Sequence, residues 1–201
     1  MGLKLNATTG GGSVELDVPN SVTGDHTLTL PSGVGSANQF IKNSGTAGTI
    51  EYSTTTEDSD GILHSPNQPY FMASLSSSTA ISNSTDTVIA WQQIATDTAS
   101  AYNSGNNSYD CPVDGLYLVN LTVQFTTDVG ALHNGMKING LGPGTNFDPW
   151  CNSGANERGH SRSEVFSLSA GDSISCHAYQ TSGGSASLEA NRTKVTIAYL
   201  G

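Results

Sequence analysis

The chain has 201 residues and a formal net charge of -10, from 17 acidic and 7 basic side chains. This length fits one domain, or two if one of them is small. A nucleic-acid partner is not expected, because wrapping a phosphate backbone requires clustered cations and none occurs between Lys42 and Lys137. Charged residues make up only 12% of the chain, and its many Ser, Thr, Asn and Gly residues are typical of short strands joined by polar turns.

Neither a secretion signal nor a membrane anchor is predicted. The sequence turns polar soon after Met1, at Lys4, and no stretch approaches the roughly 20 apolar residues that a membrane span needs. Three cysteines, Cys111, Cys151 and Cys176, leave at least one thiol without a partner in the chain. We therefore expect synthesis in a reducing cytoplasm, and the sequence leaves open whether any two cysteines pair.

The first part of the chain, residues 1–55, has too few large apolar side chains to close a core. Alternation of apolar and polar residues predicts short strands with one buried face at 14–18 and 26–30. Glycines restrict two further strands to about 39–41 and 49–52. Such a segment must bury its apolar side chains against other chains or against a larger surface, so we predict that it serves attachment.

A polar run predicts a linker over residues 56–68. The carboxylates of Glu57, Asp58 and Asp60 lie close together there, and such carboxylates supply the hard oxygen ligands that calcium prefers. The run lacks the spacing and the closing Glu of a known calcium loop. A solvated turn is therefore the favoured interpretation. No cofactor is predicted, and the sequence leaves open whether calcium is bound, since no ligand set can be assigned.

Residues 69–201 are predicted to form an all-β sandwich. Strand-like segments recur at the spacing of such folds, near 70–75, 87–94, 108–112, 115–126, 132–138, 163–169, 173–180 and 188–200. Every second residue from Tyr117 to Phe125 is apolar, which predicts a strand with one face in a core. No window carries apolar residues at helical spacing over three turns.

Three motifs in this region resemble the globular head of complement C1q, whose fold is shared with the tumour necrosis factor (TNF) superfamily. Residues 108–117 follow the pattern aromatic-x-Cys-Pro-x-x-Gly-x-Tyr, residues 166–174 a strand-turn-strand with a tight hairpin turn, and residues 196–200 a closing strand. The fixed positions are Tyr109, Cys111, Pro112, Gly115 and Tyr117 in the first motif, Gly171 and Asp172 in the second, and Tyr199 in the third.

This resemblance implies a ten-stranded jelly roll over residues 69–201 that assembles as a homotrimer around a three-fold axis. It implies no catalytic machinery. Members of this superfamily bind partners with loops and side surfaces of the trimer. The collagen stalk of the complement proteins is not expected here, because the chain has no Gly-X-Y repeat.

Residues 27–52 resemble a segment that is common in fibre and structural proteins of tailed phages, marine ones especially. Its apolar positions in this chain are Leu28, Leu30, Phe40 and Ile41. The resemblance implies a virion protein that assembles in the host cytoplasm. In that case, residues 1–55 would attach to the particle and to sister chains.

A loop over residues 140–162, rich in glycine and proline, is predicted to be irregular and to bind a partner. Its candidate contact residues are Phe147, Trp150, Arg158, His160 and Arg162. Trp and Arg on loops often anchor partners, and the face of a Trp ring suits a sugar. In the alternative interpretation, Trp150 covers the barrel edge or the trimer seam, and both arginines pair with acidic residues between subunits.

No enzyme is predicted, because the five histidines are scattered without zinc-ligand spacing and the acidic residues lie mostly in turns. The predicted function is a homotrimeric fibre or spike-type appendage of a bacteriophage virion, whose head binds a glycan or protein on the host surface. Membrane insertion is not expected. Two alternatives stay open: a capsid decoration protein that cements capsomers, and a non-viral lectin-like binding module.

Overall fold

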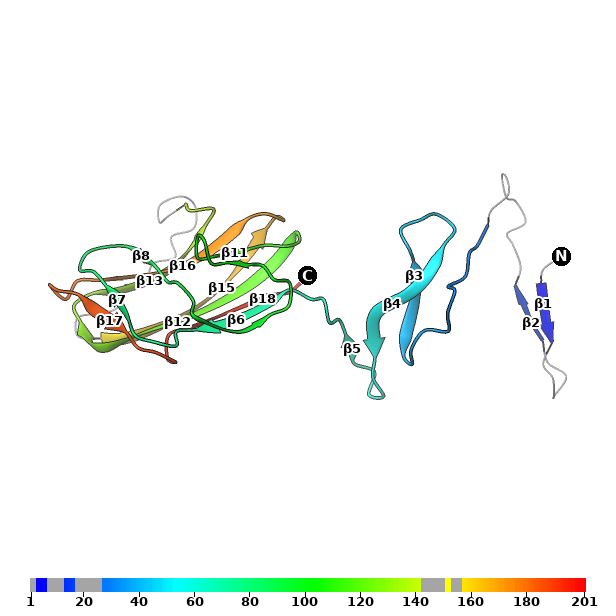
Figure 1. The fold of residues 1–201 in the computed structure, drawn as a ribbon, viewed down its shortest axis with the longest axis horizontal. Coiled ribbons are helices and arrows are strands. Elements are labelled where there is room, and N and C mark those ends of the chain that lie inside the picture. The colour runs from blue at the N-terminus through cyan, green and yellow to red at the C-terminus, as the bar shows by residue number, and fades with distance from the viewer. Residues whose placement is uncertain (1–2, 7–12, 17–26, 142–150, 153–156) are drawn as a thin grey trace. The chain divides into compact units, whose positions relative to one another are not determined.

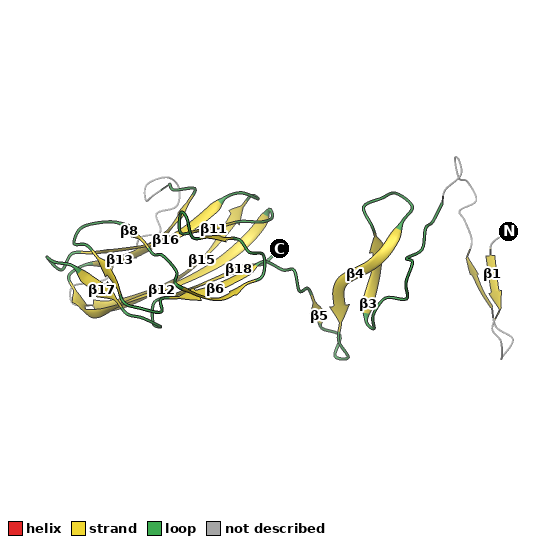
Figure 2. Ribbon diagram, in the orientation of Figure 1, coloured by secondary structure: helices red, strands yellow, loops and turns green. Residues whose placement is uncertain are grey.

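The computed structural model describes residues 3–6, 13–16, 27–141, 151–152 and 157–201. The chain divides into two compact units, Met1–Ser65 and Pro66–Gly201, whose strands are labelled in Figure 1. All helix and strand structure in the described ranges is β-strand, as Figure 2 shows, so the all-β prediction is confirmed. These ranges contain no helix long and apolar enough to cross a membrane.

The described residues of the N-terminal unit form two small antiparallel sheets. In the first, β1 (Leu3–Asn6) pairs with β2 (Ser13–Leu16). In the second, β4 (Ile50–Glu57) lies between β3 (Gln39–Asn43) and β5 (Leu63–His64). The predicted strands at 14–18, 39–41 and 49–52 therefore correspond to β2, β3 and β4, with shifted ends.

The strand predicted at 26–30 is absent from the described part of that range. Only Thr29 forms a bridge, to Thr49, and Leu28 and Leu30 are 65% and 67% exposed. The alternation of the sequence is not matched by a buried face here, because the described residues of this unit form no second layer that would cover these leucines.

The segment predicted as a linker, 56–68, contains the end of β4 and all of β5, which pair with each other. The turn between them is held by Asp58, whose Oδ1 accepts the N–H groups of Asp60 and Ile62 at 2.9 Å. Asp58 Oδ2 lies 2.9 Å from His64 Nε2, and hydrogen bonding, chiefly to His64, lowers the pKa of Asp58. Both carboxylate oxygens are thus used within the turn, which supports the solvated-turn interpretation.

The described residues of the C-terminal unit form a sandwich of two antiparallel sheets with seven and six strands. The seven-stranded sheet contains β6 (Tyr70–Ser74), β7 (Thr79–Ile81), β9 (Gln93–Asp97), β12 (Gly115–Val129), β15 (Glu157–Leu168), β17 (Ala186–Leu188) and β18 (Lys194–Tyr199). The six-stranded sheet contains β8 (Thr87–Val88), β10 (Tyr102–Asn103), β11 (Ser108–Asp110), β13 (Leu132–Ile138), β14 (Cys151–Asn152) and β16 (Ser173–Gln180). The described residues thus form more strands than the ten that the resemblance implies.

β12 supplies the centre of the core. Every second side chain from Tyr117 to Phe125 is fully buried, as the alternation predicts, and the intervening residues face outward. These side chains belong to one cluster with Ile174 and Cys176 of β16 in the opposite sheet. In the seven-stranded sheet, β12 lies between β15 and β18, and β6 follows β18 (Figure 1).

Two of the predicted strands are each divided in two. Residues 87–94 contribute to both β8 and β9, because the backbone N–H of the buried Trp91 donates to Tyr102 Oη at 3.0 Å and not to a strand ladder. Residues 188–200 contribute to β17 and β18, which are separated by a turn where Asn191 has a positive φ of 61°. Alternation does not reveal such breaks, because both flanking strands keep the same types of apolar residue.

Gly115 begins β12 at a position that disfavours any side chain. Its φ is 145°, and a Cβ there would lie 2.6 Å from the Tyr199 ring and 2.7 Å from the carbonyl oxygen of Gly201. We predict that Gly115→Ala lowers the free energy of unfolding by about 1–3 kcal/mol in urea denaturation. Gly184→Ala, whose Cβ would meet open space, should change it by less than about 0.5 kcal/mol. Equal effects of the two substitutions would contradict this explanation.

Candidate functional site

The aromatic residues of the first and third motifs pack in one cluster with Phe71, through tilted and edge-to-face contacts. Ring centroids are 5.5 Å apart for Phe71 and Tyr109, 6.5 Å for Tyr109 and Tyr117, and 5.4 Å for Tyr117 and Tyr199. The hydroxyl of Tyr117 donates to the carbonyl oxygen of Val113 at 2.8 Å. Burial raises the pKa of Tyr109 and Tyr117. These motif residues therefore lie in the core and present no reactive group.

The turn around Gly171 and Asp172 joins the two sheets. The Asp172 carboxylate accepts the side-chain amide of Asn139 at 2.7 Å and the N–H of Ser169 at 2.8 Å, and these bonds lower its pKa. The prediction of a hairpin is wrong, because β15 pairs with β12 while β16 pairs with β11 and β13. The Asp172 side chain accepts hydrogen bonds within the turn. The strands on either side of the turn therefore need no hydrogen bonds to each other.

Cys111 and Cys176 are free thiols, each 2% exposed. Burial raises the pKa of both thiols to about 12. Neither is a thiolate at neutral pH, so both act as small apolar side chains and not as nucleophiles. Cys111 directly follows β11, and Pro112 stands between it and the turn into β12. The side chain of Cys151 lies outside the described part of the structure.

The predicted irregular loop over 140–162 is partly a strand. β15 begins at Glu157, so Arg158, His160 and Arg162 lie on a strand and not on a loop. The prediction is wrong for this part because the long strand β12 pairs with β15 almost throughout its length. Phe147 and Trp150 lie outside the described residues.

The two arginines of β15 form ion pairs within the chain. Arg158 Nε lies 2.6 Å from Asp128 Oδ1, and Arg162 Nη2 lies 2.6 Å from Glu164 Oε2. In the ladder with β12, His160 and Arg162 stand opposite inward-facing residues. They therefore line the edge of the sandwich interior, which differs from the open partner surface that the sequence predicts.

The outer face of the seven-stranded sheet is apolar and almost uncharged. We define it by Tyr70, Met72, Leu116, Leu118, Val165 and Ala198. Strand register places four of these, from Val165 through Leu118 and Ala198 to Tyr70, in one row across β15, β12, β18 and β6. Met72, Leu116 and Val165 are 38%, 44% and 48% exposed. Within the described chain, the charged residues at outward positions of these four strands are Lys194 and the Asp128–Arg158 ion pair, and none of them lies in the row.

The sequence prediction does not include this outer face. A signal is present in β12, where Leu116 and Leu118 occupy the outward phase that continues with Asn120, Thr122 and Gln124. A single exposed leucine needs no explanation, but a row across four strands does. Such a row becomes visible only when the register between the strands is known.

A polar cluster lies on the outer face of the six-stranded sheet. Ser175 Oγ is 3.0 Å from His177 Nε2, and His177 Nδ1 is 2.9 Å from Asp86 Oδ1. The Lys137 ammonium forms an ion pair with the same Asp86 carboxylate. The order Ser, His, Asp is that of a hydrolase relay. However, β16 is paired on both sides at Ser175, with β11 and with β13, so its backbone offers no free N–H pair for an oxyanion.

His177 makes the stability of this sheet depend on pH. Burial lowers its pKa from 6.5, and Lys137 acts the same way, against the opposing effect of Asp86. As the pH falls below 6.5, the unfolded chain therefore takes up a proton before the folded chain does. We expect the free energy of unfolding to be unaffected by His177 above pH 6.5 and to fall below it. His177→Gln should flatten this decrease in urea titrations, and an unchanged slope would contradict the assignment.

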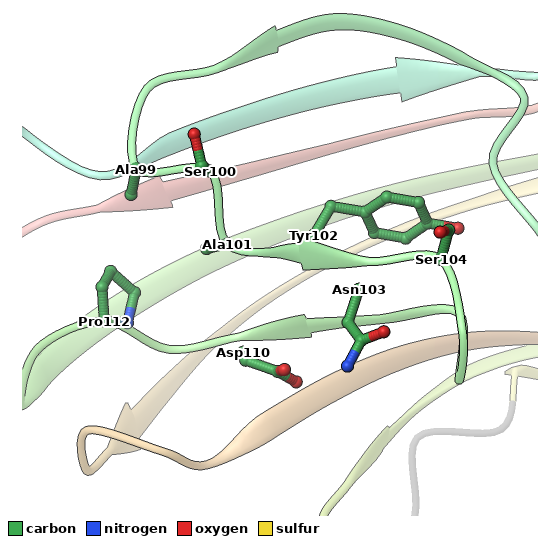
Figure 3. Close-up of a pocket in the computed structure, with 8 residues that line it drawn as sticks. All are labelled: Ala99, Ser100, Ala101, Tyr102, Asn103, Ser104, Asp110 and Pro112. Atoms are coloured by element: carbon green, nitrogen blue, oxygen red, sulfur yellow. The ribbon is translucent and has the colours of Figure 1, made fainter.

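An open groove of about 550 Å³ lies beside the β10–β11 hairpin. Figure 3 shows the side chains of Asn103 and Asp110 extending toward one another over this hairpin, with Pro112 at one end. The backbone is held from behind by Asp97, which accepts the N–H groups of Ala101 and Tyr102. The groove offers hydrogen-bonding groups. It offers no aromatic platform, because the Tyr102 ring stacks on Phe71 at 5.2 Å.

No metal-binding cluster of three or more His, Cys, Asp or Glu side chains occurs among the residues that the structure describes. The geometry found there consists of a packed core, a polar outer sheet with an open groove, and an apolar outer sheet face.

No protein-family profile and no curated protein sequence matches the chain. Several solved structures match it. Murine APRIL matches with 18% identity and a TM-score of 0.50, over 66% of this chain and 99% of its own. The globular domain of zebrafish complement 1qA matches with 10% identity and a TM-score of 0.49, over 67% and 98%. Eiger TNF from S. frugiperda matches with 10% identity and a TM-score of 0.45, over 67% and 94%. Together with the two-sheet topology, the APRIL match shows that residues 66–201 have the all-β jelly-roll fold of C1q- and TNF-like domains.

Proposed function

We propose that the chain is a structural protein of a bacteriophage virion that assembles as a homotrimeric fibre or spike. Residues 1–55 attach it to the particle and to sister chains, and the jelly-roll head points outward and binds the host surface. The virion protein is assembled in the host cytoplasm. The observation that carries self-association is the outer face of the seven-stranded sheet.

Self-association is supported by the chemistry of that outer face. In the single chain, Val165 of its row is exposed and Leu118, Ala198 and Tyr70 are half-buried. Burying the rest of such a row against another copy removes apolar area from water at about 25 cal/mol per Å². The near absence of charge means that few ions would need to be desolvated. The resemblance to C1q and TNF heads, which assemble as homotrimers, favours three copies.

The virion assignment is supported by the N-terminal unit. Residues 27–52 of this unit resemble a segment of tailed-phage structural proteins, and Leu28, Leu30, Phe40 and Ile41 are all exposed in the single chain. Exposed apolar residues concentrated in a core-poor segment are expected of a part that is covered in an assembly. The proposed attachment function gives these side chains a partner.

Electron microscopy of native particles with an antibody to the head tests this proposal. Label on a fibre or spike is the expected result, and absence of the protein from purified virions would overturn it. Deletion of the gene distinguishes a fibre or spike protein from a capsid decoration protein. Loss of adsorption with intact heads is expected for a fibre or spike, whereas fragile heads with normal adsorption would indicate capsid decoration.

A further inference from the structure

Backbone hydrogen bonds and a close side-chain contact hold residues 27–65 in a defined backbone conformation. The Thr29 N–H donates to the carbonyl oxygen of Gly48 at 2.7 Å, and the Ile50 N–H donates to that of Thr29 at 3.0 Å. A Cβ at Gly35 would lie 2.8 Å from the Tyr52 ring. The segment before β3 thus lies against the β3–β4 hairpin at two points, one of which a larger residue than glycine would obstruct.

Despite this defined backbone, residues 27–65 contain no buried side chain. From residue 27 to residue 65 every side chain is at least partly exposed. The exposed large apolar residues are Leu28, Leu30, Val34, Phe40, Ile41, Ile62 and Leu63. A three-stranded sheet needs a covered apolar face to be stable in water. Within the described part of this unit, the segment before β3 contacts the Tyr52 ring but leaves no side chain buried, so the cover is incomplete there.

Both faces of the β3–β4–β5 sheet need covering. Phe40 and Ile41 are consecutive on β3, so they project from opposite faces, and they are 41% and 60% exposed. Ile41 stands opposite Tyr52 in the ladder, which extends the apolar surface of its face. On the face of Phe40, Lys42 and Glu51 form an ion pair at 2.9 Å, so that face carries no uncompensated charge at its centre.

We propose that residues 27–65 are an inter-chain layer, in which the three-stranded sheet of each copy is covered on both faces by the same segment of sister copies. A flat docking surface would cover one face and leave the other in water, whereas a closed ring of copies encloses both. The inference rests on the self-association proposed above, because heads held together would bring the N-terminal segments to millimolar effective concentration. The segment is then stable only in the assembled molecule.

Hydrogen–deuterium exchange of the full chain, without virions, tests this inference. We expect amides of residues 39–57 to exchange at least about tenfold more slowly in the oligomer than in an unstructured peptide. Ile41→Asp should abolish this protection and leave the head protected and oligomeric. Ser59→Asp introduces the same charge at an exposed position of the β4–β5 turn and should leave the protection intact.

Each other outcome overturns the inference in a recognisable way. An oligomeric chain whose residues 39–57 exchange as an unstructured peptide would leave self-association standing and remove the inter-chain layer. Protection that arises only after purified particles are added would identify the particle, and not a sister chain, as the covering surface. A monomeric chain would overturn both the self-association and the inter-chain layer.

Discussion

Val165→Asp should convert the oligomer into a folded monomer. Val165 is 48% exposed in the single chain and stands opposite Leu118 at the end of the row on the outer face. If copies associate through this face, the substitution buries an unpaired carboxylate at every interface, which costs several kcal/mol. We expect the association constant to fall at least about a hundredfold, as measured by sedimentation velocity over a dilution series.

Two variants separate loss of association from loss of folding. Ser104→Asp places the same charge at an exposed position between β10 and β11 in the other sheet and should leave the oligomer unchanged. Val165→Thr keeps the shape of the side chain and should weaken association only partly. If Val165→Asp stays oligomeric while it remains folded, the outer face is not the site of self-association.

Tyr117→Ala should cost about 3–5 kcal/mol of unfolding free energy, as large-to-small replacement of a buried aromatic residue does. Tyr117 is fully buried at the centre of the aromatic cluster, with edge-to-face contacts to Tyr109 on one side and Tyr199 on the other. Truncation would leave a cavity lined by rings that cannot collapse onto it. Because domains of this size have only about 5–15 kcal/mol of stability, the variant should unfold at a much lower urea concentration.

Tyr117→Phe measures the hydroxyl separately from the ring. It removes the hydrogen bond from Tyr117 Oη to the Val113 carbonyl oxygen and the longer one that Oη accepts from the Val113 N–H, so the expected loss is about 0.5–1.5 kcal/mol. The two variants should therefore differ by a few kcal/mol in equilibrium urea unfolding. Nearly equal losses would mean that the hydroxyl, and not the ring, holds this part of the core together.

The long strands of the head were predictable because alternation and burial agree along them. β13 and β16 have the bounds that the sequence predicts, 132–138 and 173–180, and β12 exceeds its predicted end by only three residues. In each of these strands one face meets the core, so the apolar residues alone define the period. The positive φ at Gly115 was also predictable, because glycine is the residue that most readily adopts a positive φ.

Features that depend on contacts between distant segments were not predictable. β7 has only three residues and is specified by its pairing with β17. β15 continues through Gly159 because β12 lies beside it. The row on the outer face combines residues from four strands, and the β10–β11 groove depends on how a hairpin is held by Asp97. Neither the row nor the groove leaves a local pattern in the sequence.

The mass of the full chain in solution tests the central claim most directly. Sedimentation equilibrium measures this mass independently of molecular shape. The account predicts a single species of three times the 20.8 kDa chain mass, which persists when the protein is diluted through the micromolar range. A species with the mass of one chain throughout that range would contradict self-association, and with it the proposed fibre or spike.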